Sequence, residues 1–196
     1  MNAEAGEGWW RLATLALLAV RWSGLALAAG FVAVGKWPEF AVAMLVALAQ
    51  VISWRSALPL AWEIAVSAVS LFAAVSSYLL LFERVQWWDI PTHFALNGLV
   101  AVLAARVLRP AGPSSAAIVT CGVVAALVWE LMECGGARWV DSSIYIAPTD
   151  TLLDIVAGAS GAAVASLLWR RDRTPEPGCE PASAPAHPSQ RAGGDG

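Results

Sequence analysis

Long runs of apolar residues alternate with short polar connections along most of the chain. Six of these runs approach the roughly 20 apolar residues that a membrane-crossing helix needs. They cover residues 12–35, 40–53, 57–82, 92–108, 115–134 and 151–169. Because lipid-exposed backbone must form its hydrogen bonds within the segment, and because these runs are too long for barrel strands, we expect helices. The pattern predicts an all-α fold, a polytopic membrane helix bundle of about six transmembrane helices.

The pattern changes at residue 172. From there to residue 196 the chain is rich in Pro, Ala, Ser and Gly, a composition that cannot bury a core. We therefore predict a six-span transmembrane domain over residues 1–171 and a disordered cytoplasmic tail over residues 172–196. His187 lies in this tail, and we expect it to have no functional role.

Composition supports the membrane assignment. The chain is 58% hydrophobic and 14% charged, with a mean hydropathy of +0.62, whereas a soluble domain averages about 25% charged residues. This balance excludes a soluble enzyme and a nucleic-acid-binding protein, and it makes the lipid bilayer the expected partner. The segment before the first apolar run is acidic, unlike the start of a signal peptide, so we expect no cleavage. The oligomeric state stays open.

Basic residues in the connections predict the orientation. With six spans, the side that carries both termini collects Arg11, Arg55, Arg106, Arg109, Arg170, Arg171 and Arg173. The other side collects Lys36, Arg84 and Arg138. We therefore expect a multi-pass protein of the bacterial cytoplasmic (inner) membrane with both termini in the cytoplasm.

Tryptophans at the predicted span ends agree with this placement, because the indole ring favours the membrane–water interface. They are Trp9, Trp10, Trp37, Trp54, Trp87, Trp88, Trp139 and Trp169. The sequence thus predicts an aromatic belt formed by these residues.

Charged side chains at membrane depth cost roughly 2.5–3.5 kcal/mol each, and here they gather near three span ends on the predicted outer side. They form three pairs, each on one helix face because of its spacing. Asp89/His93 and Asp150/Asp154 are spaced i, i+4, and Glu130/Glu133 is spaced i, i+3. At about 1.5 Å rise per residue, the pairs stack as two layers. The outer layer holds Asp89, Glu133 and Asp150, and the inner layer holds His93, Glu130 and Asp154.

Five carboxylates in one place cannot all be ionised and unpaired at low dielectric. Either some are protonated or a cation lies among them. One histidine with several carboxylates is a hard-donor set that suits a divalent metal such as Mg²⁺, Mn²⁺ or Fe²⁺, and also Zn²⁺. The expected metal ligands are Asp89, His93, Glu130, Asp150 and Asp154, with Glu130 or Glu133 as catalytic base. A two-metal site with bridging carboxylates is a further option.

Simpler roles compete for the outer layer. Asp89 and Asp150 are suited to cap the helices that they begin, and Glu133 could pair with Arg138 at the surface. The predicted depth of the inner layer removes such explanations, so its three residues favour a functional role.

Two further charges, Arg21 in the first run and Glu63 in the third, lie at similar depth from the cytoplasmic side. Their opposite signs predict a structural salt bridge. The alternative is that Glu63 reaches the interface and that Arg21 divides the first helix.

The connection over residues 135–149 is the longest on the outer side and begins with Gly135 and Gly136. It fits a lid over the acidic layers and an ordinary connector equally well.

The spacing of the polar motifs resembles a known family. Asp-x3-His, Trp-Glu-x2-Glu and Asp-x3-Asp followed by Gly-x2-Gly, within residues 88–169, resemble the YjdF-type family of small bacterial inner-membrane proteins, often grouped with VanZ-like proteins. The first three runs agree only in hydropathy, and the segment before the last motif is shorter than is common in that family. The resemblance marks as its recognisable positions Asp89, His93, Glu130, Glu133, Asp150 and Asp154. VanZ-like relatives are linked to glycopeptide resistance, which implies envelope lipids.

Three functions fit these features. The first is a metal-dependent hydrolase or transferase that acts on an envelope lipid head group. The second is an ion- or proton-coupled transporter, although the carboxylates stop in the outer half and no inverted repeat is detected. The third is a non-catalytic scaffold that binds metal or lipid.

Overall fold

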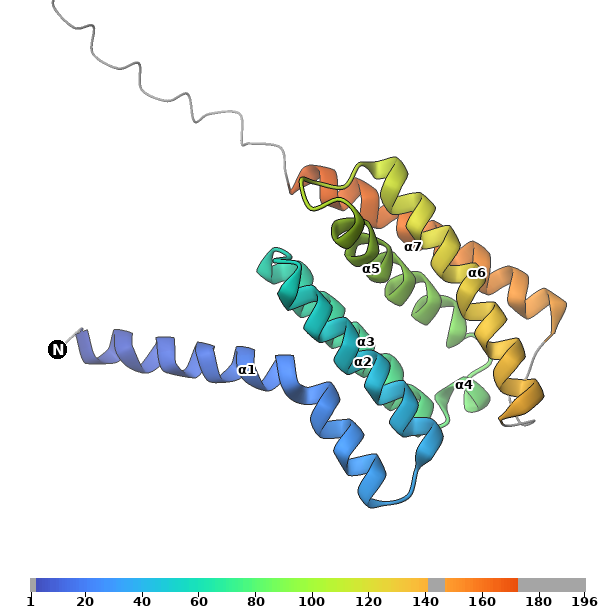
Figure 1. The fold of residues 1–196 in the computed structure, drawn as a ribbon, viewed down its shortest axis with the longest axis horizontal. Helices are drawn as coiled ribbons and strands as arrows, with labels where there is room; N and C mark the ends of the chain where they lie inside the picture. Colours follow the sequence, from blue (N-terminus) through green and yellow to red (C-terminus); the bar gives the residue numbers. More distant parts are fainter. Residues whose placement is uncertain (1–2, 141–146, 173–196) are drawn as a thin grey trace, which may run out of the picture.

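The computed structural model describes residues 3–140 and 147–172, with side chains from residue 14 onward. These residues form helices and no strand. The helices are α1 (Ala3–Ala33), α2 (Trp37–Arg55), α3 (Leu60–Tyr78), α4 (Leu81–Arg84), α5 (Asp89–Leu108), α6 (Ser115–Trp139) and α7 (Pro148–Arg171) (Figure 1). All except the short α4 are long and apolar enough to cross a membrane, which confirms the predicted all-α, six-span fold. The predicted tail lies, from residue 173 onward, outside the described residues.

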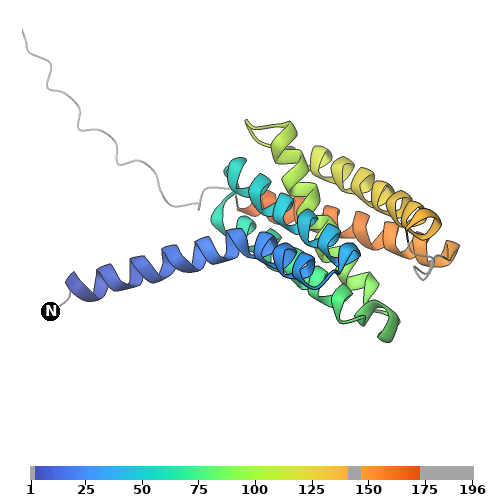
Figure 2. The ribbon, with the colours of Figure 1, turned by 60° about the horizontal axis from the view of Figure 1, so that its bottom comes forward.

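The long helices run back and forth and pack as two groups. Helices α5, α6 and α7 contact one another and form one group. In the other group, α2 contacts both α1 and α3. Contacts between α3 and α5 join the groups, whereas the first half of α1 diverges from the bundle (Figures 1 and 2). The short α4 lies at the same end of the bundle as the end of α6, which is the predicted outer end.

Two predicted boundaries are wrong, each for a local reason. We expected Gly135 and Gly136 to end the fifth helix, but α6 continues to Trp139, because transmembrane helices tolerate glycine well. We expected one helix over residues 57–82, but α3 ends at Tyr78 and α4 follows it. Leu80, with φ of 56°, occupies the left-handed region and breaks the helix there.

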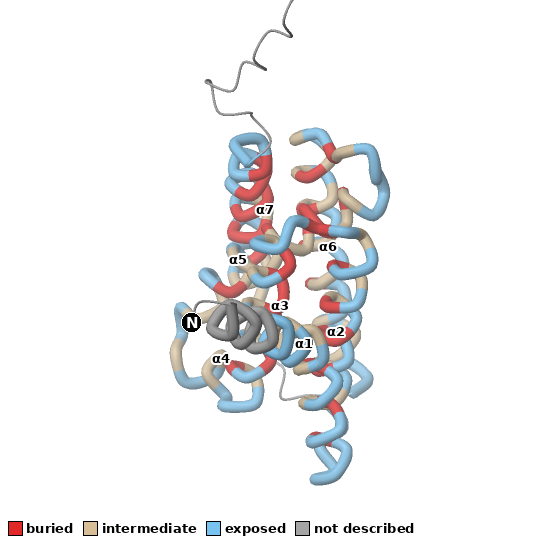
Figure 3. Tube along the Cα trace, turned by 90° about the vertical axis from the view of Figure 1, so that its left-hand side faces the viewer, coloured by how far each residue is buried: buried red, intermediate tan, exposed pale blue. Residues whose placement is uncertain are grey.

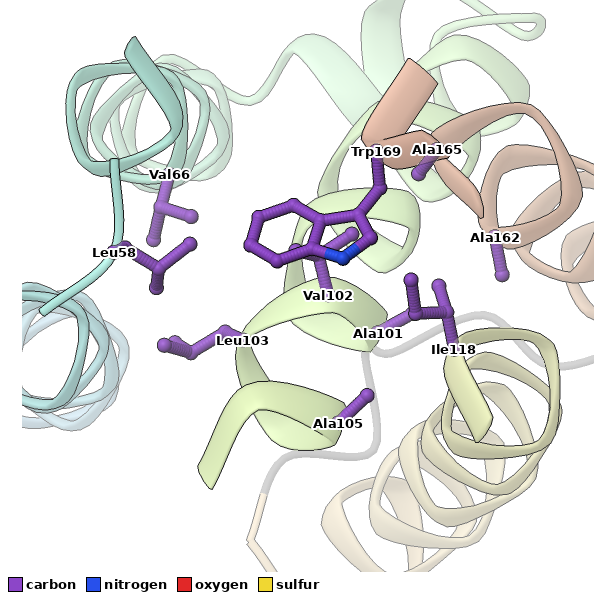
Figure 4. Close-up of a cluster of buried hydrophobic side chains, with 10 residues drawn as sticks. All are labelled: Leu58, Val66, Ala101, Val102, Leu103, Ala105, Ile118, Ala162, Ala165 and Trp169. Carbon is purple, nitrogen blue, oxygen red and sulfur yellow. The ribbon is translucent and has the colours of Figure 1, made fainter. Parts of the chain in front are cut away.

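The main core lies where α3, α5, α6 and α7 meet (Figure 4). Small side chains let the helices approach, and Trp169 of α7 fills the centre with 2% of its surface exposed. Its ring packs against Trp62 with centroids 5.4 Å apart. The prediction that Trp169 belongs to the interfacial belt is therefore wrong, because it shares the inward face of α7 with Ala162 and Ala165.

The outward faces of the helices are apolar and exposed. Figure 3 shows buried positions recurring along α7, with exposed positions on the outer surface of the bundle. Trp37, Trp87 and Trp139 are 63%, 61% and 83% exposed, near helix ends, as a membrane-interface belt requires.

The predicted salt bridge between α1 and α3 is present. Arg21 donates through Nε and Nη2 to the two carboxylate oxygens of Glu63, with an Nη2–Oε2 distance of 3.1 Å. The guanidinium carbon Cζ of Arg21 lies over the Trp54 ring, 5.4 Å from the ring centroid. The alternative, in which Arg21 divides the first helix, is wrong because α1 is continuous through this position.

Candidate metal centre

Glycines bring α5 and α7 into backbone contact just below the acidic residues. A Cβ atom on Gly161 would lie 1.9 Å from the carbonyl oxygen of Phe94, and one on Gly98 would lie 2.8 Å from the Gly161 oxygen. A Cβ atom on Gly158 would lie 2.4 Å from Nδ2 of Asn97. Small residues at helix interfaces commonly allow membrane-spanning helices to pack this closely. Polar side chains about one turn further toward the outer end are therefore brought together.

The second contact of this kind joins α6 to α7. A Cβ atom on Gly122 would lie 2.2 Å from the Cβ atom of Ala162. Asn97 links the same helices to α5, because its Nδ2 donates to the carbonyl oxygen of Gly122 at 2.9 Å. The three helices thus converge around one axis.

The inner layer predicted from the sequence meets at this convergence. His93 of α5, Glu130 of α6 and Asp154 of α7 each offer a ligand atom, and these atoms lie within 4.8 Å of one another. Glu130 is 7% exposed and Asp154 is 4% exposed, whereas His93 is half-buried. A nitrogen and two carboxylates from three helices therefore face a common point.

The carboxylate of Glu130 is not fully hydrogen-bonded. Its Oε1 atom is buried and has no hydrogen-bond partner. Leaving a buried acceptor unsatisfied costs about 1–3 kcal/mol, and more for a charged group. A buried carboxylate oxygen without a partner, on one of the three residues, is an acceptor that a cation could satisfy or a proton could neutralise.

The outer layer surrounds this centre more loosely, and two of the expected metal ligands, Asp89 and Asp150, do not belong to the group of ligand atoms that lie within 4.8 Å of one another. Oδ1 of Asp89 lies 3.9 Å from Nε2 of His93, and Oε1 of Glu133 accepts a hydrogen bond of 2.7 Å from Nε1 of Trp129. Asp150 lies within electrostatic range of Asp89 and Asp154. Among the residues that the structure describes, no lysine or arginine forms an ion pair with any carboxylate of the two layers.

The competing structural roles of the outer layer are not found. The N-cap residues of α5 and α7 are Trp88 and Ala147, and neither Asp89 nor Asp150 makes a capping hydrogen bond. Both aspartates lie inside the first turn, where the helix dipole still favours a negative charge. Between the described side chains of Glu133 and Arg138 there is no ion pair, because Glu133 bonds to Trp129 instead.

The outer connection, interpreted equally well as a lid or as an ordinary connector, is shorter than predicted. Helix α6 extends to Trp139 and α7 begins at Pro148, so much of the 135–149 connection is helical. Its central part, residues 141–146, lies outside the described residues, and the lid stays a prediction.

Two residues that were not predicted as part of the site, Trp129 and Asn97, help to position it. The Trp129 ring packs edge-to-face against the His93 ring, with centroids 6.5 Å apart and planes at 77°, while its nitrogen holds Glu133. The i, i+4 spacing of Trp129 and Glu133 was the available signal. Asn97 follows His93 by four residues and so shares its helix face.

The donor set suits a divalent ion. Two ligands of one ion at about 2.1 Å can be at most about 4.2 Å apart, so atoms 4.8 Å apart would need to approach each other by at least about 0.6 Å. One imidazole with two carboxylates resembles the ligand sets of Mn²⁺, Fe²⁺ and Zn²⁺ centres and leaves coordination positions open. The arrangement can therefore hold an ion and still admit water or a substrate oxygen.

Comparison with known proteins identifies a family whose description names no activity. A family model described as "Predicted membrane protein (DUF2238)" matches residues 9–174, which include every residue of both layers. No curated protein and no solved structure matches the chain. The more specific resemblance to YjdF-type and VanZ-like proteins stays a prediction.

Proposed function

The chain belongs to this family of predicted membrane proteins, and we propose that it is a metal-dependent hydrolase or transferase acting on lipid head groups at the outer face of the bacterial inner membrane. The observation that supports this most is the buried triad of His93, Glu130 and Asp154, in which Oε1 of Glu130 has no partner. In a purely structural cluster, this buried acceptor would lower the stability of the protein without any compensation. A bound cation would give the oxygen a partner.

The chain's own residues have distinct parts in the proposed reaction. His93, Glu130 and Asp154 hold a divalent ion, which supplies polarisation of a phosphoryl or carbonyl oxygen and activation of a water. Glu133 lies one helical turn nearer the surface than Glu130 and is held by Trp129. We assign it the role of general base, because it can accept a proton from a water beside the triad.

The position of the triad supports a lipid substrate. The triad lies near the end of the membrane-spanning helices at which the exposed Trp87 precedes α5, and the outward faces of these helices are apolar. The excess of arginine at the opposite end of the helices supports an outward orientation. A head group at this interface reaches the triad without crossing the bilayer.

Metal content tests the proposed centre. The protein, purified in mild detergent and loaded with Mn²⁺ or Zn²⁺, is expected to hold one ion per chain by elemental mass spectrometry. Replacing His93 with Gln, Glu130 with Gln or Asp154 with Asn should reduce this content to background. Glu39→Gln is the matched control, because Glu39 is an acidic residue near the same end that pairs with Lys36 at 3.5 Å. Background metal in the wild-type protein after loading would contradict the proposal.

Turnover tests the chemistry separately. With vesicles of phosphatidylethanolamine and phosphatidylglycerol, product release measured by mass spectrometry should stop on chelation and resume on metal addition. Glu133→Gln should retain metal but lower turnover by roughly 10²-fold or more, the usual contribution of a general base. Equal turnover by Glu133→Gln and the wild-type protein would remove Glu133 from the mechanism.

A further inference from the structure

The outer layer carries negative charge that the proposed metal does not neutralise. Glu130 and Asp154 together balance one divalent ion, and His93 must be neutral to bind it. Asp89, Glu133 and Asp150 remain, and no lysine or arginine among the described residues pairs with them. A site with surplus negative charge favours a ligand that brings a positive charge.

The outer layer does not have the geometry of a second metal site. Within the described residues, the only group of three or more potential ligands that comes within 4.8 Å is the inner triad. Glu133 is committed to Trp129, and the side chain of Asp89 is 31% exposed. Dispersed, partly hydrated carboxylates suit an organic ammonium group, which binds by hydrogen bonds of about 2.7–2.9 Å rather than by coordination.

The aromatic residues place this layer at head-group depth. Trp88 directly precedes Asp89, and its ring lies 5.6 Å from those of both Phe72 and Trp87. Trp87 is 61% exposed at the helix end. Exposed tryptophans of this kind mark the membrane–water interface, so the ammonium group that reaches Asp89 is most readily one carried by a lipid.

The spacing of the two layers fits one such head group. Asp89 precedes His93 by four residues and Asp150 precedes Asp154 by four, an axial separation of about 6 Å. In an ethanolamine head group, four bonds of about 1.5 Å separate phosphorus from nitrogen and span about 5 Å when extended. A phosphate at the inner triad therefore places the ammonium group among the outer carboxylates.

We propose that the site binds an amine-bearing phospholipid of the phosphatidylethanolamine type, with its phosphate at the His93–Glu130–Asp154 triad and its ammonium group received by Asp89 and Asp150. This inference rests on the proposed metal centre and names its lipid. A phosphatidylglycerol head group ends in a neutral glycerol, so it lacks the charge attraction that the outer layer offers to an ammonium group.

Lipid competition in detergent tests the assignment. Metal-loaded protein is mixed with equal amounts of phosphatidylethanolamine and phosphatidylglycerol that carry the same acyl chains, and bound lipid is counted by native mass spectrometry. We expect the wild-type protein to prefer phosphatidylethanolamine by roughly tenfold. The Asp89→Asn/Asp150→Asn variant should lose this preference while its metal content stays at one ion per chain, which also shows that it is folded. The control Glu39→Gln should keep both.

The possible failures are distinguishable. Equal binding of the two lipids by metal-loaded wild-type protein overturns the head-group assignment and leaves the metal centre standing. Wild-type protein that holds no metal overturns both. Water-soluble glycerophosphoethanolamine should bind at least roughly tenfold more weakly than the lipid, and equal affinity would assign the site to a soluble amine instead.

Discussion

Glu130 is the residue at which stability and function conflict most clearly. Its carboxylate is buried, one oxygen lacks a partner, and the nearest charged groups include other carboxylates. Such a group destabilises the protein unless a ligand satisfies it, and residues of this kind are typical of binding sites.

We therefore predict that Glu130→Gln stabilises the metal-free protein by about 1–3 kcal/mol, because it removes a buried charge. The same substitution should abolish metal binding. The thermal unfolding midpoint, followed by tryptophan fluorescence in detergent, measures the first effect, and Glu39→Gln should shift it little. A metal-free Glu130→Gln protein that unfolds at a lower temperature than the wild type would show that the charge is structural.

At the other end of the bundle, removing one charge of the Arg21–Glu63 pair should lower stability, in contrast to Glu130→Gln. Arg21→Met leaves Glu63 buried and unpaired, which should cost about 3 kcal/mol or more. Arg21→Met/Glu63→Leu should recover most of this loss, because no charge is then left behind. Metal content should be unchanged in both variants. A single variant as stable as the double one would mean that leaving Glu63 unpaired carries no penalty, which would contradict this prediction.

At the scale of the element, the site depends on how closely α5 and α7 pack. Gly161→Ala would place a methyl group 1.9 Å from the Phe94 carbonyl oxygen, so the helices must separate. Because misplaced ligands typically lose about 10–100-fold in affinity, we expect metal binding to weaken by at least roughly tenfold.

Gly30→Ala is the matched control for this prediction. A Cβ atom at Gly30 of α1 meets nothing within 4 Å, so this variant should bind metal like the wild type. Titration with Mn²⁺ compares the two variants directly. Unchanged affinity in Gly161→Ala would mean that the helix contact does not position the ligands.

The helices and the membership of the inner layer were predictable, because both follow from periodicity. Four-residue spacing fixes which side chains share a face, and the cost of charge in lipid singles out His93, Glu130 and Asp154. The continuation of α6 past Gly136 was not predictable, because glycine breaks helices in water and is tolerated in membranes. The partner of Glu133 lies one turn earlier on the same helix and followed from the four-residue spacing, whereas the inward turn of Trp169 depends on tertiary packing.

At the scale of the whole molecule, the proposal requires the triad to face outward. In a cysteine-free background, Lys36→Cys should react with a membrane-impermeant maleimide added to intact cells, because Lys36 lies at the outer end and is exposed. Ala111→Cys, exposed between α5 and α6, should react only after the cells are permeabilised. The reverse pattern would place the site in the cytoplasm and would contradict the orientation drawn from arginine placement.

In the proposed centre, His93 and two carboxylates, each from a different helix, hold one metal ion. The chain has two histidines, which makes a single spectroscopic measurement decisive. In pulsed electron paramagnetic resonance of Mn²⁺-loaded protein, we predict coupling to one histidine nitrogen, present in the wild type and in His187→Gln and absent in His93→Gln. Bound Mn²⁺ without nitrogen coupling, or with coupling that survives in His93→Gln, would contradict the account.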